Sequence, residues 1–168
     1  YRESNLELHA SGTVDKPIII EAAVPGQTTI TGSVPFTDWT ATNQPNVFVH
    51  DWPYSWAKGT YQGNDIAKRK DMVIVDGSVL RPVLKMSKLD NNTYYLDEAQ
   101  QKLFIRINKK IDKVDVEIPQ AEKLLLSNDH QYIIMRGLNF ENANPYLLDY
   151  GVDFGHSQHV LIEDTHFR

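Results

Sequence analysis

Two segments near the C-terminus of the chain repeat each other, and this repeat limits the possible folds more than any other feature. Residues 131–142 read QYIIMRGLNFEN, and residues 159–168 read HVLIEDTHFR. At a separation of 27 positions, the apolar pairs that match are Ile134 with Leu161, Met135 with Ile162, and Phe140 with Phe167. A strand–turn–strand unit of this kind cannot bury its own apolar face and must stack on a neighbour. The repeat therefore predicts two consecutive layers of a stacked β coil.

The N-terminal segment carries the same kind of pattern. Residues 5–9 alternate between polar and apolar side chains, as in a half-buried strand. Two further short runs, 18–22 and 28–32, are separated by the turn Pro25-Gly26. Short strands divided by glycine and proline turns, without helical periodicity, indicate an all-β coil. We therefore predict that residues 1–33 form the first coil.

Residues 34–129 interrupt the coil pattern and are interpreted as an inserted small antiparallel β lobe, after which residues 130–168 continue the coils. Within the lobe, Asp76 and Gly77 stand between two apolar runs, and this pair tolerates the positive φ angles of a type I′ hairpin turn. Pro82 cannot donate a hydrogen bond to a ladder, so we expect it at a sheet edge or a strand end.

A second hairpin is predicted from residues 93–96 and 103–107, which are joined by a tight turn. Short helical turns are expected only at residues 87–90 and 120–126. The lobe is therefore predicted to be a small β structure with little helix.

Two pairs of polar residues in the repeat have expected structural roles. Arg136 matches Glu163 at the 27-residue separation, which predicts an ion pair between layers that contributes at most about 1 kcal/mol if exposed. Asn139 and Asn142 stand at an expected coil corner. We interpret them as members of stacked asparagine ladders.

Several of these segments resemble a known family. Residues 12–22, 25–26 and 29–33 are similar to the opening coil of right-handed parallel β-helix proteins of the pectate-lyase-like superfamily. Residues 132–140 and 160–167 are similar to its next coils. The resemblance implies an all-β fold, with the first coils of a right-handed parallel β-helix and an inserted small antiparallel β lobe. That superfamily contains lyases, glycoside hydrolases, esterases and non-catalytic adhesins, so the fold alone does not define a function.

The lobe resembles the N-terminal insert of large bacterial secreted β-helix proteins of glycoside hydrolase-like groups. The matching segments are residues 51–56, 69–77, 93–98 and 103–106. This resemblance implies a carbohydrate-active protein, without indicating a particular sugar or bond.

The charge and composition exclude several classes of function. A formal net charge of −5 argues against general nucleic-acid binding, which needs clustered Lys and Arg. We interpret the one basic cluster, residues 68–70, as a solvated run. The chain has no cysteine, so it has neither a disulfide framework nor a thiolate zinc site. No apolar run reaches the ~18–20 residues of a membrane span.

The compartment and the chain ends give two further expectations. The lack of cysteine suits a bacterial exported protein, and we expect it to be secreted or at the cell surface. The chain begins with Tyr1 and stops at Arg168, directly after a strand-like segment without the polar cap that the end of a solenoid needs. We therefore expect an N-terminal piece of a longer protein, with the remainder of its own chain as a partner.

Three aromatic residues, Trp52, Tyr54 and Trp56, lie within five positions around a proline. Aromatic faces stack on the C–H faces of sugar rings, so these residues are candidates for substrate binding to a polysaccharide or oligosaccharide. The alternative is that the rings fill a seam between lobe and coil, because large aromatic side chains dominate small cores.

The segment after residue 148 is rich in titratable groups. Glycoside hydrolysis needs two carboxyl groups, which lie ~5–5.5 Å apart for retention and ~6.5–9.5 Å apart for inversion. Strands on neighbouring layers lie ~4.8 Å apart, so carboxylates on adjacent layers can reach either geometry. Asp153, followed by Asp149 and His156, are the candidate catalytic residues, because they lie on a turn between stacked strands where a cleft could open.

A lyase would instead need a base and a cation that neutralises a uronate carboxyl group. Asp149 and Asp153 could contribute to a calcium site, so calcium is the one cofactor that the sequence leaves open. His156 and His159 have no third ligand at metal spacing, so no zinc site is expected.

These observations lead to one main hypothesis and two alternatives. The main hypothesis is the N-terminal part of an extracellular polysaccharide-degrading β-helix enzyme, a glycoside hydrolase rather than a polysaccharide lyase, with most catalytic residues outside this segment. The first alternative is a non-catalytic carbohydrate-binding or adhesion module. The second is a purely structural capping domain.

Overall fold

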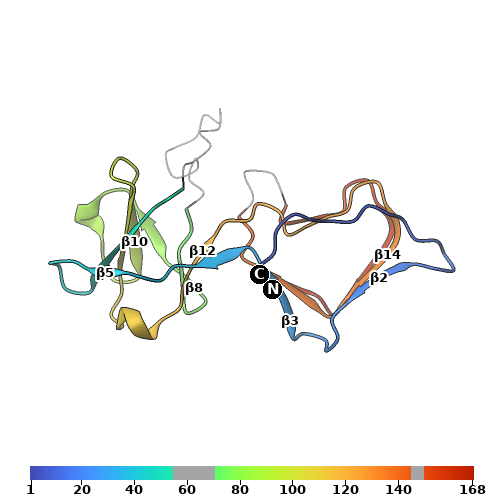
Figure 1. Ribbon diagram of the computed structural model, residues 1–168, viewed down its shortest axis with the longest axis horizontal. Coiled ribbons are helices and arrows are strands. Elements are labelled where there is room, and N and C mark those ends of the chain that lie inside the picture. Colours follow the sequence, from blue (N-terminus) through green and yellow to red (C-terminus); the bar gives the residue numbers. More distant parts are fainter. Residues whose placement is uncertain (55–70, 145–149) are drawn as a thin grey trace. The chain divides into compact units, whose positions relative to one another are not determined.

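The computed structural model describes residues 1–54, 71–144 and 150–168, and the chain forms two compact units (Figure 1). The layered unit comprises Tyr1–Val34 and Pro119–Arg168. The inserted unit comprises Pro35–Ile118. Two short strands, β4 (Ser33–Pro35) and β12 (Val116–Pro119), carry the chain from one unit to the other and back. Strands are the main regular structure of the described residues, which otherwise contain two short 3-10 turns, as predicted for an all-β protein.

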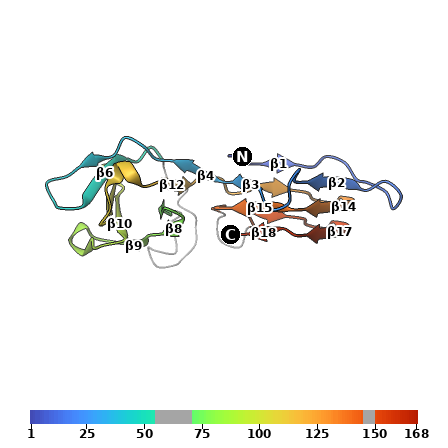
Figure 2. The same ribbon diagram turned by 90° about the horizontal axis from the view of Figure 1, so that it is seen from below.

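Three parallel sheets of three strands build the layered unit, and each takes one strand from each of three successive passes of the chain. The first sheet contains β1 (Leu6–Glu7), β13 (Leu125–Leu126) and β16 (Val152–Asp153). The second contains β2 (Ile18–Glu21), β14 (Gln131–Arg136) and β17 (Gln158–Glu163). The third contains β3 (Thr28–Thr31), β15 (Leu138–Glu141) and β18 (His166–Phe167). Figure 2 shows the strands of the second and third sheets as stacked rows.

The predicted 27-residue register is confirmed. Ile134 pairs with Leu161 and Phe140 pairs with Phe167, both in parallel ladders. The turns repeat as well, because the residues with positive φ recur at the same separation: Asp129 and His156, Tyr132 and His159, and Gly137 and Asp164. The second and third passes therefore share both their strand register and their turn geometry.

Alternate side chains of the middle layer form the core of the layered unit. Ile133 and Met135 on β14 are fully buried, and Leu138 and Phe140 on β15 are nearly so. This follows from the period-2 geometry of strands, because residues i and i+2 point to the same face. Phe140 stacks on Phe167 of the next layer, with ring centroids 5.7 Å apart and planes 11° apart.

The third layer presents the same columns of side chains to solvent. Ile162 is 43% exposed, whereas Met135, its partner in register, is 0% exposed. Phe167 is 54% exposed and its partner Phe140 only 2%. The apolar interior of the stack is therefore open at the third layer.

The Arg136–Glu163 ion pair between layers is confirmed, with Nε 3.5 Å from Oε2, and Glu21 lies 3.9 Å from the same guanidinium. All three side chains are at least 41% exposed, so each pair contributes at most about 1 kcal/mol.

The asparagine ladder prediction was wrong for Asn139. The adjacent layers place Thr29 and His166 at its position, so no asparagine lies in register with it. Its amide instead donates to the Gly26 carbonyl at 2.9 Å and to Thr29 Oγ1 at 3.3 Å. Asn142 donates to two hydroxyl groups, those of Thr31 and Ser33.

The inserted unit is built on a five-stranded sheet in the order β5 (Thr40–Ala41), β6 (Val47–Asp51), β11 (Lys102–Arg106), β10 (Thr93–Asp97) and β9 (Arg81–Val83). All neighbours are antiparallel except β9 and β10, which are parallel. A smaller antiparallel group joins β12 to β7 (Ile74–Val75) and β7 to β8 (Ser78–Val79). Leu103, Ile105 and Ile107, at alternate positions, are buried in this unit.

Both predicted hairpins of the inserted unit are confirmed. β7 and β8 pair across Asp76 and Gly77, whose φ angles are 47° and 73°, as a type I′ turn requires. β10 and β11 form the second hairpin. Pro82 lies in β9, at an edge of the five-stranded sheet, where its missing N–H does not interrupt a ladder.

Two predictions about the end of the inserted unit need correction. The lobe was expected to run to residue 129, whereas the compact unit ends at Ile118. The segment 120–126 is not helical, because Gln120 and Ala121 both donate their backbone N–H to the Gly32 carbonyl, and Leu125 pairs in parallel with Leu6. The observed 3-10 turns are η1 (Met86–Lys88), close to the expected one, and η2 (Ile111–Lys113), which was not expected.

Gly12 lies where the first two layers approach each other closely. A Cβ at this position would lie 2.6 Å from the Tyr132 carbonyl oxygen and 2.7 Å from the Ile18 nitrogen, and neither backbone atom can move away on its own. We expect Gly12→Ala to lower the free energy of unfolding by about 3 kcal/mol. Gly26→Ala is the control, because a Cβ there meets nothing within 4 Å and only its φ of +74° opposes it, at about 1 kcal/mol. Urea unfolding of both variants measures this, and equal losses would contradict the packing argument.

Asp76 gives the hairpin turn a pH dependence. Its carboxylate pairs with the Lys109 ammonium and accepts the Asp115 backbone N–H at 3.0 Å, and these contacts hold the pKa of Asp76 below its ordinary value. A lowered pKa in the folded state means stabilisation that is present above the ordinary pKa and lost as pH falls through the folded value. Asp76→Asn should therefore destabilise the chain near pH 6 and have a smaller effect near pH 2, as measured by urea unfolding. Asn tolerates the positive φ, so the turn is kept. A pH-independent difference would contradict the assignment.

Candidate functional site

The predicted aromatic site lies in the inserted unit, and its first residue is buried. Trp52 is 2% exposed, and its ring packs against Phe36 and Tyr54 at centroid distances of 6.0 and 5.1 Å. Tyr54 is half-buried, and burial raises the pKa of its hydroxyl group. Trp56 lies outside the described residues. The burial of Trp52 favours core filling over stacking on a sugar, although the core that it fills belongs to the inserted unit itself.

Asp153, the first candidate catalytic residue, ends strand β16 of the layered unit and is half-buried. Its Oδ1 accepts the Gly155 backbone N–H at 2.8 Å. Its Oδ2 lies 3.8 Å from the Lys123 ammonium. The carboxylate is therefore held in one orientation by the protein. Asp149, the second candidate, lies outside the described residues.

His156 follows on the same turn, in the left-handed region with φ 55°, and its side chain is 87% exposed. Its Nδ1 lies 3.9 Å from Oδ1 of Asp129, which occupies the same position one layer earlier. Asp153 and His156 thus have different partners, and His156 is much more exposed than Asp153.

The sequence leaves one metal open, calcium, with Asp149 and Asp153 as candidate ligands. Of these two residues, Asp149 lies outside the described part of the chain. Within residues 1–54, 71–144 and 150–168, the structure brings together no group of three or more His, Asp or Glu side chains that could hold a metal ion. In the same part of the chain, no helix is long and apolar enough to cross a membrane.

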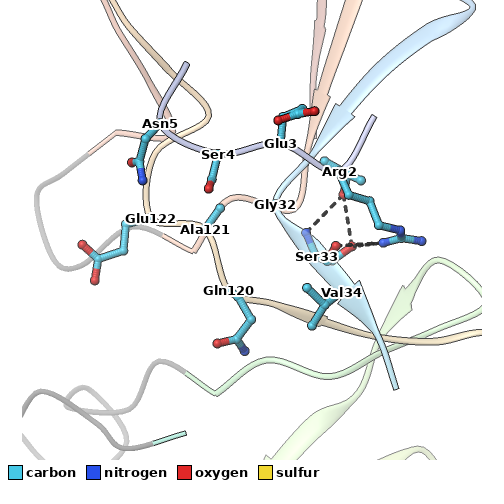
Figure 3. A pocket seen from close by; sticks show the side chains of 11 residues that line it. Arg2, Glu3, Ser4, Asn5, Gly32, Ser33, Val34, Gln120, Ala121 and Glu122 are labelled. Atoms are coloured by element: carbon cyan, nitrogen blue, oxygen red, sulfur yellow. Dashed lines mark hydrogen bonds between the residues drawn. The ribbon is translucent and has the colours of Figure 1, made fainter. Parts of the chain in front are cut away.

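The layered unit also contains a cavity of about 360 Å³, lined mostly by polar residues, that was not predicted from the sequence (Figure 3). We call it the Arg2 cavity, and its polar lining residues include Arg2, Ser4, Asn5, Ser33, Gln120 and Glu122. The Arg2 guanidinium is held by the Ser33 carbonyl oxygen, 2.8 Å from Nη1.

The lining of the Arg2 cavity comes from the N-terminal segment and from the two chain segments that flank the inserted unit, as Figure 3 shows. These segments are distant in sequence, and the only local signal is the polar run at residues 2–5. The hydroxyl, amide and carboxylate groups can exchange hydrogen bonds with a polar ligand. No aromatic ring is among the described residues that line it.

The fold is shared with two solved structures. One is a complex of XylC with xylose, which matches 86% of this chain at 17% identity with a TM-score of 0.63. The other is a glycoside hydrolase, which matches 84% of this chain at 12% identity with a TM-score of 0.52. The chain spans only 29% and 42% of these two structures. No family model and no curated protein matches the sequence. The likeness to glycoside hydrolase-like structures is therefore one of fold alone.

The burial of Trp52 leads to a direct test of its role. We expect Trp52→Ala to lower the free energy of unfolding by about 3–5 kcal/mol, because it empties a well-packed site among Phe36 and Tyr54. Trp52→Phe keeps most of the apolar volume and should cost less. Thermal unfolding of both variants measures the two losses of stability. Little or no loss of stability in Trp52→Ala would contradict the core-filling role.

Proposed function

We propose that this chain is the N-terminal part of an extracellular polysaccharide-degrading enzyme, a glycoside hydrolase rather than a lyase. In this proposal the layered unit forms the first coils of a right-handed parallel β-helix, and the inserted unit is a lobe on those coils. The observation that carries the proposal is the likeness over 86% of the chain to a solved protein with a bound sugar, XylC with xylose. The second solved structure, a glycoside hydrolase, supports the same reaction class.

The layered unit supports the β-helix part of the proposal. Its three sheets each gain one strand per pass, and the register between the second and third passes repeats without a slip. Ile162 and Phe167 continue the buried columns but are about half exposed. A further layer at the same spacing would cover them, and burial of each side chain would contribute about 1.5–3 kcal/mol.

Stacked layers suit the chemistry of glycoside hydrolysis. Two carboxyl groups must lie on either side of the bond that is cleaved, one protonated and one ionised. Strands on neighbouring layers lie ~4.8 Å apart, so carboxylates that extend from them can reach the separations of ~5–9.5 Å that this reaction needs. Since the chain spans 29% of the XylC structure, we assign most of the catalytic residues to the remainder of the protein. From the described residues Asp153 is our candidate contributor, with His156 beside it on the turn and Asp149 outside the described residues.

The location follows from the substrate. A polysaccharide in the surroundings of a cell is too large to cross a membrane unaided, so an enzyme that degrades it acts outside the cell. We therefore propose a secreted or cell-surface protein.

A non-catalytic carbohydrate-binding or adhesion module is the second candidate. The contacts of Asp153 favour it, because Oδ1 accepts the Gly155 N–H and Oδ2 faces Lys123 at 3.8 Å. A carboxylate that is engaged on both oxygens can serve structure alone. Activity measurements on the whole protein separate the two candidates.

The test is hydrolysis of aryl xylosides and of neutral polysaccharides by the full-length protein. We expect release of reducing sugar, without an unsaturated product that absorbs in the ultraviolet. If Asp153 acts as acid or base, Asp153→Asn should lower kcat by about 10²–10⁴-fold. Asp15→Asn is the control, because this carboxylate is exposed on a turn of the same unit and belongs to no candidate site.

Sugar binding by the full-length protein without release of any product would reject the enzyme in favour of the adhesion module. Normal turnover by Asp153→Asn would leave the enzyme proposal standing and exclude Asp153 from its catalytic residues.

A further inference from the structure

The inserted unit contains a second cavity, of about 300 Å³, which we call the Trp39 cavity. Its lining includes Phe36, Asp38, Trp39, Ile111, Asp112 and Val114. It combines two aromatic rings, two carboxylates and two aliphatic side chains. We propose that the Trp39 cavity is a subsite for one neutral pyranose ring of a polysaccharide. This inference rests on the proposed carbohydrate function and assigns part of the binding to the inserted unit.

Trp39 has the fixed orientation that a stacking platform needs. Its Nε1 donates a hydrogen bond to the Phe36 carbonyl at 2.9 Å. Its ring packs against Phe36 and His50, with centroid distances of 6.5 and 5.2 Å. The side chain remains partly exposed and lines the cavity. Because the ring is already ordered, little conformational entropy is lost when a ligand stacks on it.

The difference between Trp39 and Trp52 is the reason for choosing this site. Both are tryptophans of the inserted unit that pack on Phe36. Trp52 is 2% exposed and is part of the core, whereas Trp39 is only half-buried and borders open volume. A ring can stack on a sugar only where one face is accessible, so the described geometry transfers the platform role from Trp52 to Trp39.

Two carboxylates at the cavity provide acceptors for sugar hydroxyl groups. Asp38 directly precedes Trp39 with φ 62°, and its Oδ2 accepts a hydrogen bond from Thr37 Oγ1 at 3.1 Å. Asp112 lies in the 3-10 turn η2, and its Oδ2 is 3.8 Å from the Lys113 ammonium. Both residues are exposed, so their remaining lone pairs can accept hydrogen bonds from neighbouring hydroxyl groups.

The same charges select the class of sugar. Two carboxylates repel a uronate, whereas a neutral pyranose offers hydroxyl donors to them and an apolar C–H face to Trp39. The volume lies at the lower end of the ~300–1,000 Å³ range of small-ligand pockets, so we assign a single ring rather than a long chain segment.

The experiment measures binding of neutral xylo-oligosaccharides and of acidic oligogalacturonates to the full-length protein by isothermal titration. We expect neutral ligands to bind better than acidic ones. Trp39→Ala should weaken neutral binding by about tenfold, and Trp39→Phe, which keeps an aromatic face, should weaken it less. Asp112→Asn should weaken binding of the neutral ligand and reduce the ratio of its affinity to that of the acidic oligogalacturonate. Glu98→Gln, at an exposed carboxylate on the turn between β10 and β11, is the matched control and should leave affinity unchanged.

Thermal unfolding checks that each variant is folded. If Trp39→Ala does not fold, the test relies on two surface changes, Asp38→Asn and Asp112→Asn. Unchanged affinity in the folded Trp39 and Asp112 variants, together with normal wild-type binding, would overturn the subsite and leave the proposed function intact. Trp39-dependent binding by a protein that releases no sugar would support the subsite and reject the enzyme. A wild-type protein that binds no neutral oligosaccharide would reject the subsite, and the hydrolysis assay would then decide the enzyme proposal separately.

Discussion

The parallel pairing of successive layers is the constraint on which the layered unit depends. The backbone N–H and C=O groups of each pass form hydrogen bonds with the neighbouring pass, in turns as well as in strands. Gly12 donates to the Gln131 carbonyl, and Gly137 donates to the Glu163 carbonyl. Unpaired buried backbone groups are costly, so a slip of one residue would lose these bonds and turn the apolar columns outward. The equal spacing of the second and third passes meets both demands at once.

The inserted unit interrupts this stack without changing its register. The chain leaves in β4 and returns in β12, and β13 then pairs with β1 as though the two were consecutive. The inserted unit has its own buried side chains, among them Leu103 and Ile105. Since the inserted unit forms a core from its own side chains, its surface is available for binding. We place a sugar subsite at the Trp39 cavity on this surface. The candidate features of the layered unit are the carboxylate of Asp153 and the Arg2 cavity.

Prediction from the sequence succeeded where the signal was local or repeated. The Asp76-Gly77 turn was predictable because few residue pairs tolerate two positive φ angles, and the 27-residue register because apolar residues recur at it. Prediction failed where distant contacts decide. The segment 120–126 pairs with β1 and donates hydrogen bonds to the Gly32 carbonyl instead of forming a helical turn. Asn139 lies in register with Thr29 instead of with another asparagine. The Arg2 cavity was missed for the same reason, because its walls come from distant segments.

The sequence by itself determined the strand periodicity, the main turns and the stacking register of the last two passes, since these depend on backbone conformation and on alternation between neighbouring residues. Only the tertiary structure decided which aromatic ring is buried and which borders a cavity. Trp52 and Trp39 are equally apolar, and both contact Phe36. Their exposure differs because burial depends on how many chain segments converge on a side chain. That number depends on long-range contacts, which are absent from the local pattern around either residue.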